Sequence, residues 1–139
     1  MSKLRIGFVL TGSFCTFAKV IPVIQALIER GDSVTPILSD SAGTLDTRFG
    51  TAAHWRQELT ALTGVSPIDS IVSAEPIGPK ALFDILIVAP CTGNTLARLA
   101  HGLTDTPATM AVKSHLRGER PVVLAVSTND GLSGSAANL

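Results

Sequence analysis

The sequence predicts a three-layer α/β domain in which helices cover both faces of a doubly wound parallel sheet. Short apolar runs alternate with segments whose apolar residues recur at helical spacing, which is typical of parallel strands joined by crossover helices. Loops rich in Gly, Ser, Thr and Asn follow several of the apolar runs. The chain has 139 residues and no repeat or low-complexity linker, so we expect a single domain at 1–139.

Five apolar runs are expected to form strands, at 4–10, 34–38, 68–72, 82–89 and 121–126. The run at 68–72 is short. The run at 121–126 has the continuous apolar character of a strand that is buried on both faces.

Helices are expected at 16–30, 52–63, 95–103 and 107–116. The apolar face of the first comprises Val20, Ile21, Ile24, Leu27 and Ile28, and that of the second comprises Trp55, Leu59 and Leu62. A further helix begins at about Ser135. Because the sequence ends inside this crossover, we expect a domain truncated at its C-terminus, with an apolar surface exposed near 121–126.

Composition argues against several functional classes. The 11 basic and 11 acidic residues give a formal net charge of zero, so the chain has no bulk attraction to nucleic acid or to an anionic membrane. No apolar run approaches the roughly 20 residues of a membrane helix. The first run breaks at Thr11-Gly12, too early for a signal peptide. With only two cysteines, Cys15 and Cys91, a cytoplasmic protein with reduced thiols is expected.

A binding site is expected at the carboxyl ends of the strands, where ligands bind in open parallel sheets. Four polar loops leave these ends, at 11–16, 39–48, 90–95 and 127–134. Their hydroxyl and backbone N–H groups, together with the positive ends of the following helices, suit an anion or a phosphate. In the first two of these loops, the candidate phosphate-binding residues are Gly12, Ser13, Thr16 and Ser39.

The first loop does not match the known nucleotide motifs. Gly7 and Gly12 have the spacing of a P-loop, but Ser13 stands where its lysine is required, and Gly7 lies inside the expected strand. The dinucleotide fingerprint Gly-x-Gly-x-x-Gly is also absent. A single phosphate is therefore favoured over a nucleoside triphosphate or NAD(P). The alternative is that Gly12-Ser13 forms only a turn, with Thr16 as a helix cap.

The stretch at 89–105, APCTGNTLARLAHGLTD, resembles a segment of the flavoprotein family that includes the FMN-dependent cysteine decarboxylases. That segment reads Pro-Ala-Ser-Ala-Asn-Thr and precedes a helix with an Ala-Asn-Gly motif. Cys91 and Gly93 depart from the pattern. The loop TGSFC at 11–15 also resembles the family's Gly-Ser phosphate loop. The resemblance implies a Rossmann-like flavoprotein fold and FMN as a cofactor, with further contacts from Pro90, Thr92, Asn94 and Thr95.

A narrower branch of this family is matched along nearly the whole chain, most specifically by SIVSAEPIGPK at 70–80 and RPVVLAVSTNDGL at 120–132. Members of this branch are subunits of enzymes that oxidise a dihydropyridine dicarboxylate, or its hydroxylated tetrahydro precursor, to an aromatic product in endospore formation. The resemblance implies an oxidoreductase subunit, a companion dehydrogenase-like subunit that uses NADP, and a homo-oligomer.

Candidate residues for such chemistry carry ordinary alternatives. Arg48, Lys80 and Asn129 are candidates for binding the dicarboxylate substrate, and a surface charge is an equal interpretation for Arg48 and Lys80. The catalytic residue is unknown, with Glu75, Cys15 and Cys91 as candidates. For both cysteines, packing is favoured over a catalytic thiol, because no histidine accompanies either one in sequence.

Two departures from the decarboxylases disfavour their reaction. The region 73–80 lacks the active-site histidine, and 128–132 keeps only Asn129 of a Met-Asn-x-x-Met cluster. Two alternatives stay open: an FMN-binding enzyme of another reaction, cysteine decarboxylation included, and a non-catalytic partner that keeps the fold. His54, His101 and His115 are expected to be surface or capping residues, and no metal site is expected.

Overall fold

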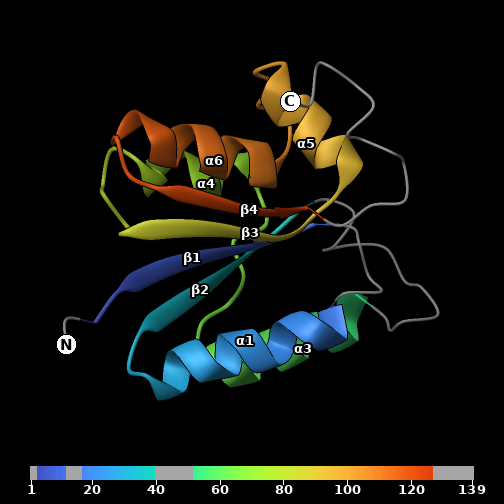
Figure 1. Cartoon of the computed structure of the whole chain (residues 1–139), viewed down its shortest axis with the longest axis vertical. Helices are drawn as coiled ribbons and strands as arrows, with labels where there is room; N and C mark the ends of the chain where they lie inside the picture. Colours follow the sequence, from blue (N-terminus) through green and yellow to red (C-terminus); the bar gives the residue numbers. More distant parts are fainter. Residues whose placement is uncertain (1–2, 12–16, 40–51, 127–139) are drawn as a thin grey trace.

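A four-stranded parallel sheet forms the middle layer of the protein (Figure 1). The structure is a computed structural model and describes residues 3–11, 17–39 and 52–126. The spatial order of the strands is β2-β1-β3-β4, with bounds Arg5–Leu10 for β1, Ser33–Leu38 for β2, Ile85–Cys91 for β3 and Val122–Val126 for β4. This order confirms the predicted doubly wound sheet, because the chain reverses its direction of travel between β1 and β3.

Helices lie on both faces of the sheet. On one face are α1 (Phe17–Glu29) and α3 (Ala52–Thr63), and on the other are α4 (Ile71–Ala74), the 3₁₀ helix η2 (Glu75–Ile77), α5 (Gly93–Ala100) and α6 (Pro107–Arg117) (Figure 1). The four predicted helices that fall in the described residues are confirmed. The helix expected at about Ser135 lies outside the described residues.

The core on the α1 and α3 face follows the predicted periodicities. Ile6, Phe8 and Leu10 of β1 alternate along the strand toward this face, where they form one cluster with the apolar faces of α1 and α3. The buried members contributed by the helices are Val20, Ile24, Trp55 and Leu59, and the partly buried ones are Ile21, Leu27, Ile28 and Leu62. Each helix therefore packs with the stripe that the sequence predicts.

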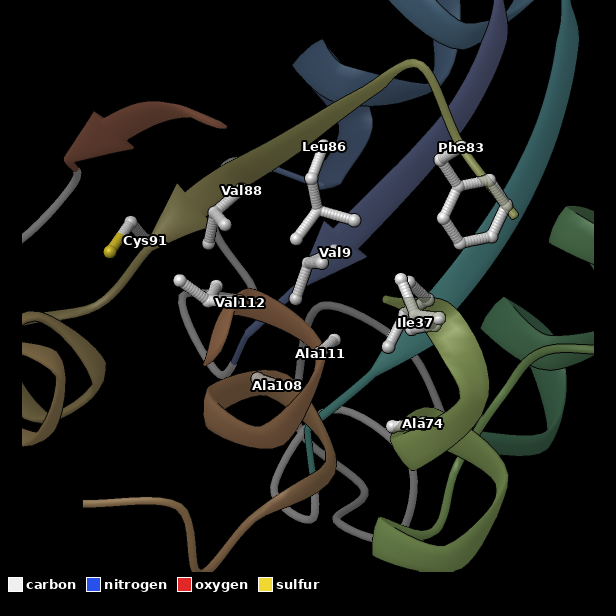
Figure 2. Packing of buried hydrophobic residues seen from close by; sticks show 11 residues of the cluster. Val9, Ile37, Ala74, Phe83, Leu86, Val88, Cys91, Ala108, Ala111 and Val112 are labelled. Carbon is white, nitrogen blue, oxygen red and sulfur yellow. The ribbon is translucent and has the colours of Figure 1, made fainter. Parts of the chain in front are cut away.

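The core on the other face is built from the remaining residues of the same strands. Val9 of β1 and Leu86 and Val88 of β3 point toward α6, as Figure 2 shows. Alternate residues of β1 and β3 are thus buried on opposite faces, which explains the continuous apolar character of these strands. The other labelled members of this cluster are Ile37, Ala74, Phe83, Cys91, Ala108, Ala111 and Val112.

Gly7 has a packing role inside β1. A Cβ atom at this position would lie 2.5 Å from Leu86 Cδ1 and 2.7 Å from Phe83 Cδ2. The missing side chain therefore makes room for Phe83 against the sheet. The glycine at position 7 is therefore explained by packing within the strand.

The prediction of a strand at 68–72 is wrong. Only Ile68 forms a β-bridge, with Ile37, and the chain then turns into α4. Ser70 and Ser73 form a capping box at the start of α4, in which the Ser70 hydroxyl accepts a hydrogen bond from the Ser73 amide at 3.0 Å. This local capping outweighs the strand preference of Ile71 and Val72.

The expectation of a fully buried strand at 121–126 is also wrong. In the described part of the chain β4 pairs only with β3, and Val123, Leu124 and Val126 are between 40% and 49% exposed. A groove of about 650 Å³ lies between this strand and the α5–α6 layer, with walls that include Leu99, Leu103, Val112, Leu116, Val122 and Leu124. The apolar surface expected near 121–126 is therefore present.

The amino ends of β1 and β3 are joined by Arg5 and Asp84. The Asp84 carboxylate accepts hydrogen bonds from the Arg5 backbone amide at 2.8 Å and from its guanidinium Nη2 at 2.9 Å, and the Asp84 amide donates to the Arg5 carbonyl at 2.7 Å. The hydrogen bonds from Arg5 lower the pKa of Asp84 to about 2. Asp84 thus contributes stability while its carboxylate is charged.

We expect Asp84→Asn to lower the free energy of unfolding at pH 7, with a difference from the wild type that shrinks in acid. A depressed carboxyl pKa contributes stability that is present above the ordinary value of 3.8 and is lost as the pH falls toward about 2. Urea unfolding between pH 7 and pH 3 measures this. Asp69→Asn, which removes an exposed ion pair with Arg56, is the control and should cost less at pH 7. A pH-independent effect of Asp84→Asn would contradict the prediction.

The exposed edge of β4 predicts self-association of the 139-residue chain. An unprotected apolar edge strand pairs readily with another chain, and a lysine on such an edge blocks the pairing. Leu124→Lys should therefore reduce the associated fraction seen by sedimentation velocity. Val72→Lys is the matched control, because Val72 is 78% exposed on α4, away from β4. If the unsubstituted chain sediments as a monomer at high concentration, the β4 edge does not drive association.

Candidate functional site

The carboxyl ends of three neighbouring strands meet at one edge of the sheet. Ser39, directly after β2, donates its backbone N–H to the carbonyl of Leu10 at the end of β1, at 3.0 Å. Thr92, directly after β3, donates its backbone N–H to the hydroxyl oxygen of Thr11 at 2.9 Å. Ser39 and Thr11 are buried, and Thr92 is half-buried. The structure therefore brings together three of the four predicted polar loop starts, and the fourth lies outside the described residues.

The turn between β3 and α5 is held by Thr92. Its hydroxyl accepts a hydrogen bond from the Thr95 backbone N–H at 3.2 Å and donates one to the Thr95 hydroxyl at 3.0 Å. Thr92 is thus the N-cap of α5, which starts two residues earlier than expected. Thr95 is buried and its hydroxyl is used inside the turn.

The first two amides of α5, one of which belongs to the buried residue Gly93, have no acceptor in the described part of the chain. The N–H groups of Gly93 and Asn94 lie in the first turn, where an α-helix provides no internal acceptor, and neither donates to another group in the described part of the chain. The side chain of Asn94 is exposed. The helix dipole adds partial positive charge at the same point, so this turn can bind an anion.

A β-bulge precedes the turn. The pairing of β3 with β4 shifts register between Val88 and Cys91, and Pro90, which has no amide hydrogen, lies within this interval. Bulges redirect the chain at the end of a strand. Pro90 thus shapes the path into the turn through its backbone.

Cys91 packs in the core and is not a reactive thiol in this structure. It is 0% exposed among the apolar residues that face α6 (Figure 2). Burial raises the pKa of the Cys91 thiol to about 11, so the sulfur stays protonated at neutral pH. The packing interpretation therefore fits, and the catalytic one does not.

Glu75 and Lys80 lie toward the opposite edge of the sheet. The Glu75 carbonyl accepts a hydrogen bond at 2.6 Å from Ser114, near the C-terminal end of α6. Ala81, next to Lys80, accepts one at 2.9 Å from the Arg5 guanidinium at the amino end of β1. The structure therefore does not bring either residue to the edge where Thr11 meets Thr92.

The remaining candidates fall outside the described residues and stay predictions. They are the phosphate-loop residues Gly12, Ser13 and Thr16, the thiol Cys15, and the proposed carboxylate ligands Arg48 and Asn129.

The three histidines have different surroundings. His54 is exposed and pairs with Glu58 at 3.1 Å, and His101 is the exposed C-cap residue of α5, as expected for surface and capping residues. The expectation is wrong for His115, which is 1% exposed, with its Nε2 atom 3.0 Å from the Pro121 carbonyl oxygen. Burial lowers the pKa of His115, which favours the neutral ring as the hydrogen-bond donor.

Two features are absent from the described residues. Among residues 3–11, 17–39 and 52–126, no cluster of three or more His, Cys, Asp or Glu side chains could hold a metal ion. In the same part of the chain, no helix has the length and apolar character to cross a membrane.

Sequence reasoning missed two residues of this edge. Thr11 and Gly93 were not among the candidate ligands, although both lie in loops expected to bind. The signal for Thr11 is a polar residue immediately after a buried strand, and the signal for Gly93 is its place one residue after a threonine N-cap.

Known proteins resemble this chain in sequence and in fold. The family model described as Flavoprotein matches residues 1–133. The chain is 47% identical over 135 residues to the dipicolinate synthase B subunit of Bacillus subtilis, in a match that covers 97% of this chain and 68% of that protein. It is 29% identical to the flavin prenyltransferase UbiX of Deinococcus radiodurans, covering 76% of this chain and 53% of that protein.

Solved structures also resemble this chain. The crystal structure of the dipicolinate synthase B subunit from Bacillus halodurans matches with a TM-score of 0.81 and 42% identity, over 94% of this chain and 68% of that chain. The FMN-dependent cysteine decarboxylase SpaF matches with a TM-score of 0.72 and 24% identity, over 97% and 74% of the two chains. The match at this lower identity shows the fold alone. Because the family model spans nearly the whole sequence and the parallel sheet has the matching fold, the chain belongs to the Flavoprotein family.

Proposed function

We propose that this chain acts as the B subunit of a dipicolinate synthase and contributes to the oxidation of a dihydropyridine dicarboxylate to dipicolinic acid in endospore formation. The observation that carries the proposal is the 47% identity to the Bacillus subtilis protein over 97% of this chain. The structural match to the Bacillus halodurans protein, at 42% identity, also exceeds the match to the cysteine decarboxylase SpaF, at 24%.

The reaction removes one hydride and one proton from the ring and is driven by aromatisation. The hydride needs an acceptor held against the ring, and FMN supplies such an acceptor when bound. In this proposal a companion dehydrogenase-like subunit that uses NADP completes the enzyme. This chain binds and orients the substrate and FMN, and it works as a cytoplasmic homo-oligomer beside that subunit.

The carboxyl edge of the sheet suits the phosphate of FMN. The amides of Gly93 and Asn94 at the start of α5 have no acceptor among the described residues and are proposed donors for phosphate oxygens, and the exposed Asn94 side chain adds another donor. Gly12, Ser13 and Thr16 are the proposed partners on the loop after β1, which leaves the sheet beside this turn. Thr92 and Thr95 stabilise the turn through the hydrogen bond between their hydroxyl groups. Ser39 donates its backbone N–H to the Leu10 carbonyl at the same edge.

Arg48 and Asn129 are the proposed ligands of the substrate carboxylates. In the sequence, both residues come after strands whose carboxyl ends lie at this edge. Lys80 and Glu75 are left out of the proposed site because they lie toward the amino ends of the strands. A cationic guanidinium forms two parallel hydrogen bonds with a carboxylate, which suits Arg48 to one end of a dicarboxylate.

A second candidate function is an FMN-dependent reaction of another kind. It is favoured by the shared fold with the FMN-dependent cysteine decarboxylase SpaF and with the DmrB protein of Burkholderia xenovorans in complex with FMN, which matches with a TM-score of 0.69. A non-catalytic partner subunit with the same fold is the third.

Reconstitution separates these functions. The companion dehydrogenase subunit alone should form little aromatic product from the dihydropyridine dicarboxylate, and adding this chain should restore product formation, followed by ultraviolet absorbance. Flavin absorbance of the purified chain is recorded in parallel. Flavin without restored activity supports the second function, and restored activity without flavin removes FMN from the proposal. If the chain shows no flavin absorbance and restores no activity, both enzymatic functions are contradicted.

We expect Asn94→Ala to weaken FMN binding roughly threefold to tenfold, because one lost hydrogen bond costs about 0.5–1.5 kcal/mol. The melting temperature should change little, since the Asn94 side chain is exposed. Quenching of flavin fluorescence gives the affinity. Gln57→Ala, which removes an exposed amide on α3, is the control and should leave the affinity unchanged. A large fall in melting temperature with unchanged affinity would make Asn94 a structural residue.

A further inference from the structure

His115 is a buried polar side chain on α6 that has no part in the candidate site. The residue is 1% exposed, and its Nε2 atom lies 3.0 Å from the Pro121 carbonyl oxygen. The same carbonyl accepts the backbone N–H of Leu86 at 3.1 Å. Leu86 lies on β3 and Pro121 directly precedes β4, so one oxygen atom joins the end of α6 to the start of the β3–β4 pair (Figure 1).

The surroundings of the His115 ring suit its neutral form. Within the described residues the Pro121 carbonyl is the one hydrogen-bond partner of the ring, so a proton added at Nδ1 creates a buried donor without an acceptor. The positive charge of Arg120 also opposes a charged ring. The Arg120 guanidinium donates to the carbonyls of Phe83 at 2.7 Å and Ala81 at 3.2 Å, and it moves away only by breaking these hydrogen bonds.

The other charged groups around α6 do not offset a charge on this ring. Asp84, just before β3, favours the protonated ring, but its carboxylate already accepts hydrogen bonds from Arg5. The remaining charged residues of α6, of the turn after it and of the segment packed against it are all exposed, namely Lys113, Arg117, Glu119, Glu75 and Lys80. Burial is the largest influence on the ring and lowers the pKa of His115, against a smaller opposing effect of the Pro121 hydrogen bond.

We propose that His115 is a pH-sensitive latch: the neutral ring holds the Pro121 carbonyl and with it the turn before β4, and protonation in mild acid releases this turn and β4 from β3. Local opening suits β4, because within the described residues it pairs only with β3 and its side chains Val123, Leu124 and Val126 are exposed. In the open form the ring reaches water and its charge is solvated. The latch does not depend on the proposed function.

The acid side of neutrality is the pH range in which the latch opens. A histidine whose pKa is lowered in the closed form stabilises that form fully above its ordinary value of 6.5, and the contribution is lost as the pH falls below 6.5. At pH 5.5, one unit lower, opening should be favoured by up to about tenfold relative to pH 7.5. The contribution of Asp84 is lost only below 3.8, so the two groups are separable by pH.

Amide hydrogen exchange measured by NMR at pH 7.5 and pH 5.5, corrected for intrinsic exchange rates, tests the latch without any ligand. Protection of the Leu86 amide should fall by up to about tenfold at pH 5.5. The Leu38 amide on β2, which donates to the Ile68 carbonyl at 2.8 Å, should keep its protection, because β2 lies at the other end of the strand order. Unchanged protection of Leu86, or equal losses at both amides, would overturn the proposal.

Two substitutions assign the effect to the ring. His115→Gln keeps an N–H donor for the Pro121 carbonyl and does not titrate, so the pH dependence of Leu86 protection should disappear whatever the stability of the variant. His101→Gln is the matched control, because His101 is an exposed histidine at the end of α5, and it should keep the wild-type response. A wild-type response in His115→Gln would rule out the latch.

The wild-type ring provides a second test that holds even if His115→Gln does not fold. NMR titration of the ring resonances shows the pH at which His115 takes up its proton. A ring that stays neutral well below pH 6.5 while Leu86 protection falls supports the latch. A ring that is protonated at pH 6.5 while Leu86 stays protected contradicts it, because the closed form would then accept the charge.

Discussion

The pairing of β1 with β3 is the constraint on which the rest of the structure depends. These strands are far apart in sequence, yet they form the centre of the sheet, and side-chain hydrogen bonds join them at both ends. At the amino end Asp84 accepts the Arg5 amide and guanidinium, and at the carboxyl end Thr11 accepts the Thr92 amide. Register and end-to-end alignment of the central pair are thereby determined together.

This central pair also decides where a ligand can bind. Because β1 is followed by α1 on one face and β3 by α5 on the other, the carboxyl end of this pair is the switch point at which open parallel sheets bind ligands. The same edge carries the N-cap of α5 and the first amides of that helix, which have no acceptor within the part of the chain that the structure describes. The opposite edge carries the Arg5–Asp84 pair and the segment around Lys80, where charged groups hold the fold rather than a ligand.

Much of the fold could be predicted because local pattern and tertiary environment agree. Strands such as β1 are buried on both faces, and helices such as α1 bury one stripe, so each shows a clear periodicity. The predictions were wrong where contacts with neighbouring residues or strands determine the structure of a segment. The segment at 68–72 follows the Ser70 capping box into a helix, and β4 reads as a buried strand but lacks a partner on its outer side in the described part of the chain. Within the site, the Thr92–Thr95 turn was predictable as a cap, whereas Thr11 was not singled out.

The sequence by itself determined the alternation of strands and helices, the flavoprotein resemblance and the polar character of the loops, because these depend on residues close together in the chain. Only the tertiary structure decided which of the candidates meet. It placed Thr11 against Thr92, moved Glu75 and Lys80 toward the other edge, and buried Cys91 and His115 in the core. The physical reason is that hydrogen-bond partners and burial depend on strand order and register, which join residues that are distant in the sequence.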